Sequence, residues 1–140
     1  FLLFAGLGSR VAERFQAAGR SRRAVRLAAG MIAGLALGYV LALPSAFQHL
    51  RELADGVKMG LSVLLIAPLA FAMGMPFPLG LAGGAARTPA LTPWAWALNG
   101  FASVAAAVLA TVLAIHWGFT AVVIVAVALY LIAAVRIPGK

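Results

Sequence analysis

Four long apolar stretches limit what this chain can fold into. None of them contains an acidic residue, and each reaches or exceeds the roughly 17 residues that a helix needs to cross a bilayer. Residues 1–8 are also apolar and resemble the end of a preceding span. We therefore predict an all-α, polytopic membrane helix bundle over residues 1–140, a single transmembrane domain with the end of a preceding helix and four full transmembrane helices at residues 24–43, 58–81, 93–117 and 119–135.

Composition supports the same class of protein. Of the 140 residues, 64% are hydrophobic and 10% are charged, with a mean hydropathy of +1.06. A soluble domain is nearer half apolar and a quarter charged, so it would lack the polar surface to cover such a core. We expect the lipid bilayer as the partner of most of the surface. Residues 1–8 lack the basic start of a cleaved signal peptide, and we expect the chain to be a fragment of a longer protein.

The basic residues set an expected orientation. Six of the eleven fall at or near a basic loop at residues 9–23, which includes helically spaced apolar residues, so a short surface helix there is an alternative. With this loop inside, nine basic residues lie on the cytoplasmic side and two, Arg51 and Lys58, on the other. Loop 9–23 and the C-terminus are then cytoplasmic. This distribution argues against a nucleic-acid partner. The cytoplasmic basic residues are Arg10, Arg14, Arg20, Arg22, Arg23, Arg26, Arg87, Arg136 and Lys140.

Glycines recur on one face of the first full span. Gly30, Gly34 and Gly38 are four residues apart, a spacing that lets another helix backbone approach closely. We interpret them as helix-packing residues. The reading that we favour is contact with another helix of the same chain, and a seam with a second copy, hence an oligomer, is the alternative.

Prolines mark the expected corners. The first full span ends at Pro44, and Pro68 lies inside the second, where it predicts a kink. Pro76 and Pro78 lie near the end of that span, so we interpret them as helix terminators in preference to a broken helix at a substrate site. Pro93 suits the first position of the third helix. After that helix, Gly118 allows a tight turn into the fourth.

The remaining polar and amphipathic residues are weak candidates for function. Trp94, Trp96 and Trp117 mark the two ends of the third span and are expected interface anchors. Asn99 and His116 are weak pathway candidates inside the same span, but structural roles are favoured for both. No catalytic, cofactor-binding or metal-ligating motif is visible, so the sequence predicts no cofactor.

Two motifs resemble a known family. The sequence GMPFPLGL at residues 74–81 is followed by PWAWALNG at residues 93–100. With the aromatic-Gly turn at residues 117–119, these resemble the C-terminal membrane region of bacterial spermidine-synthase-like membrane proteins, of the fused major-facilitator/spermidine synthase type. The opening FAGLGS at residues 4–9 and the Arg-rich segment after it are similar too.

The resemblance implies a multi-pass protein of the bacterial inner (cytoplasmic) membrane. Its membrane helices would be joined to an aminopropyltransferase-like, polyamine-related soluble domain, whose motifs do not occur in this chain. The expected function is a membrane module that anchors this domain and delivers a small cationic or lipophilic substrate to it. Its partners would be the remaining helices and the soluble domain of the same polypeptide. The alternatives are part of a secondary transporter with a proline-broken helix, or a structural membrane scaffold subunit.

Overall fold

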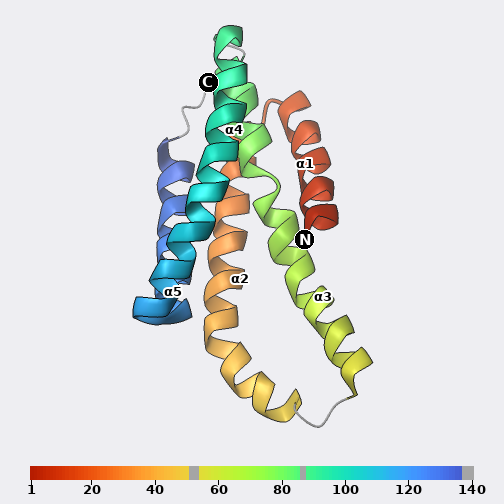
Figure 1. The fold of residues 1–140 in the computed structure, drawn as a ribbon. Helices are drawn as coiled ribbons and strands as arrows, with labels where there is room; N and C mark the ends of the chain where they lie inside the picture. Colours follow the sequence, from red (N-terminus) through yellow and green to blue (C-terminus); the bar gives the residue numbers. More distant parts are fainter. Residues whose placement is uncertain (51–53, 86–87, 137–140) are drawn as a thin grey trace.

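The computed structural model describes residues 1–50, 54–85 and 88–136 of the protein. Within these ranges the chain is all-helical, without strands, which confirms the predicted fold class. Arg51, Arg87 and Lys140, which contribute to the expected charge distribution, lie outside the described residues. The elements are α1 (Leu2–Ala17), α2 (Ser21–Leu50), α3 (Asp55–Met73), α4 (Pro76–Ala85), the 3₁₀ helix η1 (Pro89–Leu91) and α5 (Thr92–Arg136) (Figure 1).

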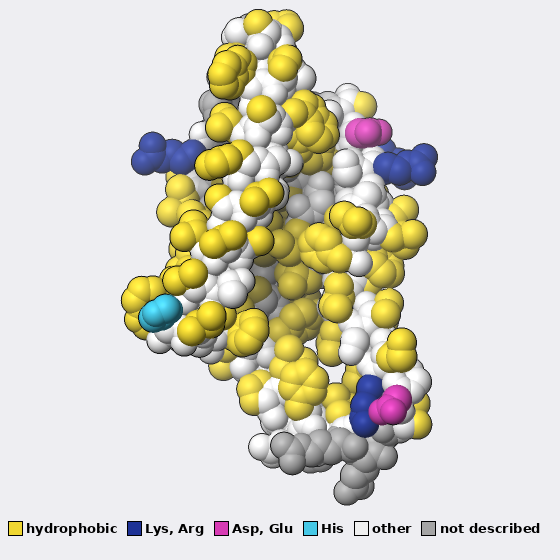
Figure 2. Space-filling view, in the orientation of Figure 1, with side chains coloured by type: hydrophobic (Ala, Val, Ile, Leu, Met, Phe, Trp, Pro, Cys, Tyr) yellow, Lys and Arg dark blue, Asp and Glu magenta, His cyan; other side chains and the backbone are white. Residues whose placement is uncertain are grey.

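The surface of the bundle is apolar. Hydrophobic side chains cover most of the face shown in Figure 2, and Leu2, Leu41 and Phe119 are each 80% or more exposed. Patches of this extent are rare on monomeric soluble proteins. Three helical segments of the described chain are long and apolar enough to cross a membrane, which is the pattern of a multi-pass membrane protein. They are Ser21–Gln48, Asp55–Ala82 and Pro89–Arg136.

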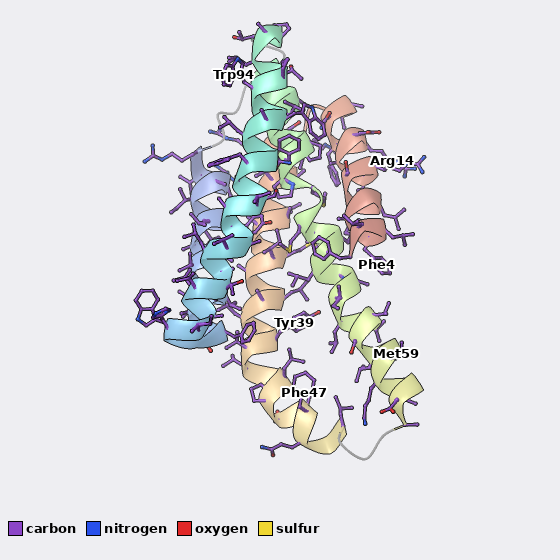
Figure 3. The ribbon with its side chains drawn as sticks, viewed as in Figure 1. Phe4, Arg14, Tyr39, Phe47, Met59 and Trp94 are labelled. Atoms are coloured by element: carbon purple, nitrogen blue, oxygen red, sulfur yellow. The ribbon has the colours of Figure 1, made fainter. Side chains whose placement is uncertain are left out.

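The first helix differs from the expected span end followed by a loop over residues 9–23. Instead, α1 continues to Ala17 because Ala12 is buried and Val11 and Phe15 pack against the core on the same side. The basic side chains of this segment point outward, as Arg14 does in Figure 3. The turn comes at Gly19, which has a φ of 66°.

Two hydrogen bonds close that turn. The N–H of Arg20 donates to the carbonyl of Phe15 over 2.9 Å, and the N–H of Gly19 donates to that of Gln16 over 2.9 Å. This pair of bonds is the Schellman motif, which needs the left-handed backbone that glycine adopts without strain. The basic residues therefore belong mostly to two helices joined by a short turn.

The second helix also runs further than expected. The expected end at Pro44 is wrong, because α2 continues to Leu50. Leu43, Phe47 and Leu50 follow one another at helical spacing and line one groove, so the apolar face continues past the proline. The cost of Pro44 is one missing N–H donor inside the helix.

The last helix reverses direction at Gly118. This residue has φ 80° and ψ 168°, a non-helical conformation inside α5. Figure 1 shows the chain descending along the first arm, turning, and rising along the second. The turn predicted at Gly118 is thus present. By length and composition the whole of Pro89–Arg136 counts as one apolar segment, so the fourth full span is not confirmed by this criterion.

The core lies at one end of the bundle, where four helices meet. Small residues dominate it, which lets the helices approach closely. Phe15, Phe71 and Tyr130 pack against its edge. At the other end, the C-terminal half of α2 and the N-terminal half of α3 diverge (Figure 1). The buried residues of the core cluster are Ala12, Ala24, Val25, Ala28, Ala29, Met75, Leu79 and Ala134.

Two glycines make the crossing of α1 and α3 possible. A Cβ built on Gly8 would overlap the carbonyl of Phe71, and one built on Gly74 would overlap the carbonyl of Ala5. The obstacle in each case is backbone, which cannot rotate aside as a flexible side chain can. The two helices therefore touch backbone to backbone at this crossing.

Replacing Gly8 by Ala tests this contact against a matched control in the same helix. We expect Gly8→Ala to lower the free energy of unfolding by about 1–3 kcal/mol, because the added methyl group forces the two backbones apart. Gly6→Ala should be neutral or stabilising by up to about 1 kcal/mol, since nothing lies within 4 Å of a Cβ at Gly6. Reversible unfolding in mixed micelles, followed by circular dichroism, measures both. Equal stabilities of the two variants would show that the crossing is not close.

Candidate functional site

The corner between α3 and α4 lies next to the core and carries the first of the two sequence motifs. Helix α3 ends at Met73, and α4 begins at Pro76. The N–H of Gly74 donates to the carbonyl of Ala70 over 3.1 Å, and the N–H of Met75 donates to that of Ala72 over 3.3 Å. The break is therefore closed by bonds from its own backbone.

The prolines of the corner act at the start of a helix. Helix α3 ends with its C-cap Gly74, two residues before Pro76, where a proline cannot continue the helix. Pro76 and Pro78 are also the first and third residues of α4, a role that the sequence did not predict. The first N–H groups of a helix have no partner within it, and an unpaired N–H is costly in lipid. A proline at these positions has no N–H to leave unpaired. The two prolines thus allow a helix to restart inside an apolar environment.

Side chains from two other helices hold the corner in place. The Nε2 of Gln16 in α1 donates a hydrogen bond to the carbonyl of Pro78 over 2.8 Å. The ring of Phe77 meets that of Trp96 in α5 edge to face, with centroids 4.9 Å apart. The side chain of Leu79, one residue beyond Pro78, is almost fully buried. The corner is accordingly a packed joint between α1, α4 and α5.

A tyrosine that the sequence did not single out bonds to α3 near its internal proline. Pro68 lies inside α3 and leaves the carbonyl of Leu64 without its usual donor. The hydroxyl of Tyr39 in α2 donates to the next carbonyl, that of Leu65, over 2.6 Å. A lone tyrosine in an apolar span, together with a proline in a neighbouring span, was the signal available in the sequence. Spacing alone could not show that the two would meet.

The tryptophans lie on the outside of α5. Trp94 and Trp117 are 68% and 71% exposed, and they lie near the two ends of the first arm. Figure 3 shows Trp94 near the end of the bundle that holds the core. Trp96 is exposed too, but its contact with Phe77 gives it a packing role that was not predicted. Pro93 is the second residue of α5, so it stands in the first turn as expected.

The polar residues of α5 do not converge on a pathway within the described chain. Asn99 and His116 are both exposed. Ser103 and Thr111 donate their hydroxyls to the carbonyls four residues earlier, over 2.7 and 2.9 Å. The Nδ1 of His116 lies 2.9 Å from the carbonyl of Val112. Such bonds satisfy polar side chains within their own helix, which suits a lipid environment.

The glycine stripe of α2 also faces outward. Gly30, Gly34 and Gly38 are exposed, and nothing lies within 4 Å of a Cβ built on any of them. The favoured contact with another helix of the same chain is therefore absent from the described residues. A packing role toward a second chain stays a prediction. Gly8 and Gly74 perform within the chain the close packing that was expected of this stripe.

Two apolar grooves flank Tyr39. One of about 750 Å³ lies between the diverging halves of α2 and α3, and one of about 510 Å³ lies between α2 and the Gly118 turn. Among the residues that the structure describes, no group of three or more His, Cys, Asp or Glu side chains could hold a metal ion. These two grooves thus offer an environment for apolar groups.

The fold and the site together define a multi-pass helical membrane protein with a packed internal joint. Comparison of the chain with protein families, with curated proteins and with solved structures found no match. The function therefore has to be argued from the chemistry of the helices themselves.

Removing the hydroxyl of Tyr39 tests its bond to α3. We expect Tyr39→Phe to lower the free energy of unfolding by about 1 kcal/mol, because the carbonyl of Leu65 loses its side-chain donor. Tyr130→Phe is the matched control, since no hydrogen bond from the Tyr130 hydroxyl is present among the described residues. Unfolding in mixed micelles compares the two. A smaller loss for Tyr39→Phe than for Tyr130→Phe would contradict the assigned bond.

Proposed function

We propose that the chain is the membrane-anchoring module of a larger protein related to the bacterial spermidine-synthase-like membrane proteins. It crosses the inner membrane four times, with the end that carries the core and most of the arginines facing the cytoplasm. The aminopropyltransferase-like soluble domain belongs to the same polypeptide outside this chain. The observation that carries the proposal is that the proline corner is a packed joint and not a lined cavity.

The length of α5 supports four crossings. Its 45 residues would extend about 70 Å as a straight helix, more than twice the roughly 30 Å of a hydrocarbon core. A single crossing would leave about half of this apolar helix in water. The reversal at Gly118 divides it into two arms, each near the length of one crossing.

The placement of charge supports the orientation. The arginines of α1 and of the start of α2 lie at the core end, as does Arg136 at the end of α5, because Ala12, Ala24 and Ala134 share one cluster. At the far end the structure describes one basic residue, Lys58, and its Nζ lies 3.3 Å from a carboxylate oxygen of Asp55. An excess of basic residues on one side is typical of the cytoplasmic side.

The surroundings of the prolines support anchoring over transport. Transporters place unwound backbone and half-helix ends at a substrate site near the midplane. Here the unwound residues contact α1 through Gly74, and Met75 is buried. The hydroxyls of Ser62, Ser103 and Thr111 are bonded to their own helices, and Asn99 is exposed.

The resemblance supports the same assignment. In the GMPFPLGL sequence at residues 74–81, Gly74 makes the close crossing, Met75 and Leu79 are buried, and the two prolines restart the helix. In the PWAWALNG sequence, Trp96 packs on Phe77. Each motif thus contributes a part of one joint, as we expect of a membrane region that serves as an anchor.

Because the chain has no cysteine, single cysteines can report its orientation in the membrane. In intact bacterial cells, a membrane-impermeant maleimide should label Ala54→Cys and Thr120→Cys, which lie at the α2–α3 connection and at the Gly118 turn. Arg22→Cys should react only after the cells are opened. This pattern requires both connections outside and the α1–α2 turn inside.

Each of the three cysteine positions tests a different part of the proposed topology. Labelling of Arg22→Cys in intact cells would reverse the orientation. Labelling of Ala54→Cys without Thr120→Cys would show that the turn at Gly118 does not reach the outer side, and the count of four crossings would be wrong. If the complete reading frame encodes no nucleotide-binding α/β domain, the proposed anchoring role is wrong.

A further inference from the structure

The larger apolar groove lies in a valley between α2 and α3 that is filled along only half of its length. The C-terminal half of α2 contributes Leu43 and Phe47, and the N-terminal half of α3 contributes Leu61 and Leu65. The bond from Tyr39 to Leu65 ties the two helices together at the groove.

Helix α1 covers the other half of the same valley. It crosses α3 backbone to backbone at Gly8 and Gly74 and contacts α2 in the core. Phe1, at the start of α1, lines the groove. The N-terminal end of α1 therefore opens onto the groove. The groove thus continues the α1–α3 interface without interruption.

The chemistry of the groove calls for an apolar occupant. The hydroxyl of Ser62 donates to the carbonyl of Lys58 over 2.9 Å, and the Nζ of Lys58 is paired with Asp55. The hydroxyl of Tyr39 is used by Leu65. Each polar side chain of the described lining thus already has a hydrogen-bond partner within the chain.

The size of the groove matches a helix. With a diameter of 10–12 Å and a pitch of 5.4 Å, one turn of helix occupies roughly 500 Å³. The groove holds about 750 Å³, or roughly one and a half turns.

We propose that this groove seats an apolar helix of the same polypeptide that runs in line with α1, so that the two form one continuous transmembrane helix between α2 and α3. The proposal rests on the proposed function, in which this chain is part of a larger membrane protein. The occupied groove completes the valley, and α2 and α3 are then covered over their full length.

Oxygen accessibility of a spin label tests this occupant. O₂ concentrates in lipid tails, so it broadens the signal of a lipid-facing label and not that of a label under a helix. The label is placed at Leu61→Cys, in the groove, and at Leu64→Cys, on the same helix but 69% exposed and outside the groove. Each variant is made in the protein encoded by the complete reading frame and in the 140-residue chain, both in nanodiscs.

The label at Leu61→Cys should lose most of its O₂ broadening in the complete protein relative to the 140-residue chain. The label at Leu64→Cys should be broadened equally in both. Equal broadening at Leu61→Cys in the two proteins would show that lipid tails fill the groove, which overturns the proposal. A loss in the 140-residue chain that disappears at high lipid-to-protein ratio would assign the groove to a second copy and would overturn it as well.

The spin-label result can be interpreted independently of the proposed function. The maleimide pattern at Arg22→Cys, Ala54→Cys and Thr120→Cys reports orientation and crossings whether or not the groove is occupied by a helix. A correct pattern with equal O₂ broadening would reject the groove occupant alone.

Discussion

The backbone contact between α1 and α3 is the interaction on which the rest of the bundle depends. Helices in lipid gain little from burying apolar side chains, because the lipid is as apolar as they are. What holds them is close packing, and Gly8 and Gly74 allow the closest approach that two helices can make. This crossing brings Gln16 to the carbonyl of Pro78 and places the corner where Trp96 can reach Phe77.

Backbone hydrogen bonding is the second constraint, and it explains the prolines. A break in a helix exposes donors and acceptors that lipid cannot satisfy. At the corner the donors of Gly74 and Met75 are used locally, and Pro76 and Pro78 have no donor to satisfy. Deeper in α3, the hydroxyl of Tyr39 bonds to a carbonyl beside the one that Pro68 leaves without a donor. A broken helix of this kind is stable without water, which is what an anchor requires and a substrate pathway does not.

The sequence predicted the features that depend on local pattern. The apolar stretches gave the all-helical class, and Gly118 gave the reversal within α5 because its left-handed backbone is a property of that residue alone. The sequence did not predict how far α2 extends. Pro44 was expected to end the helix, but α2 and its apolar face continue to Leu50.

The packed corner could not be predicted from the sequence, because it depends on contacts between helices that are distant along the chain. The regular spacing of Gly30, Gly34 and Gly38 predicted a packing face, but that face is exposed. The single glycines Gly8 and Gly74 instead lie against the backbone of another helix. A close approach depends on where two helices cross, and no periodicity within one helix encodes that position. The glycine of the GMPFPLGL motif was visible in the sequence, but its partner on α1 was not.

Whether water reaches the α3–α4 corner decides between a packed joint and a lined cavity. Amide hydrogen exchange of the protein in nanodiscs, resolved at Gly74 and Met75, measures this. In a dry, packed joint these amides should exchange slowly, like those of the buried residues Ala28 and Ala29 in α2. Exchange as fast as at Ala54, the exposed residue before α3, would mean that water reaches the break, and the corner would then be a lined cavity instead of a joint.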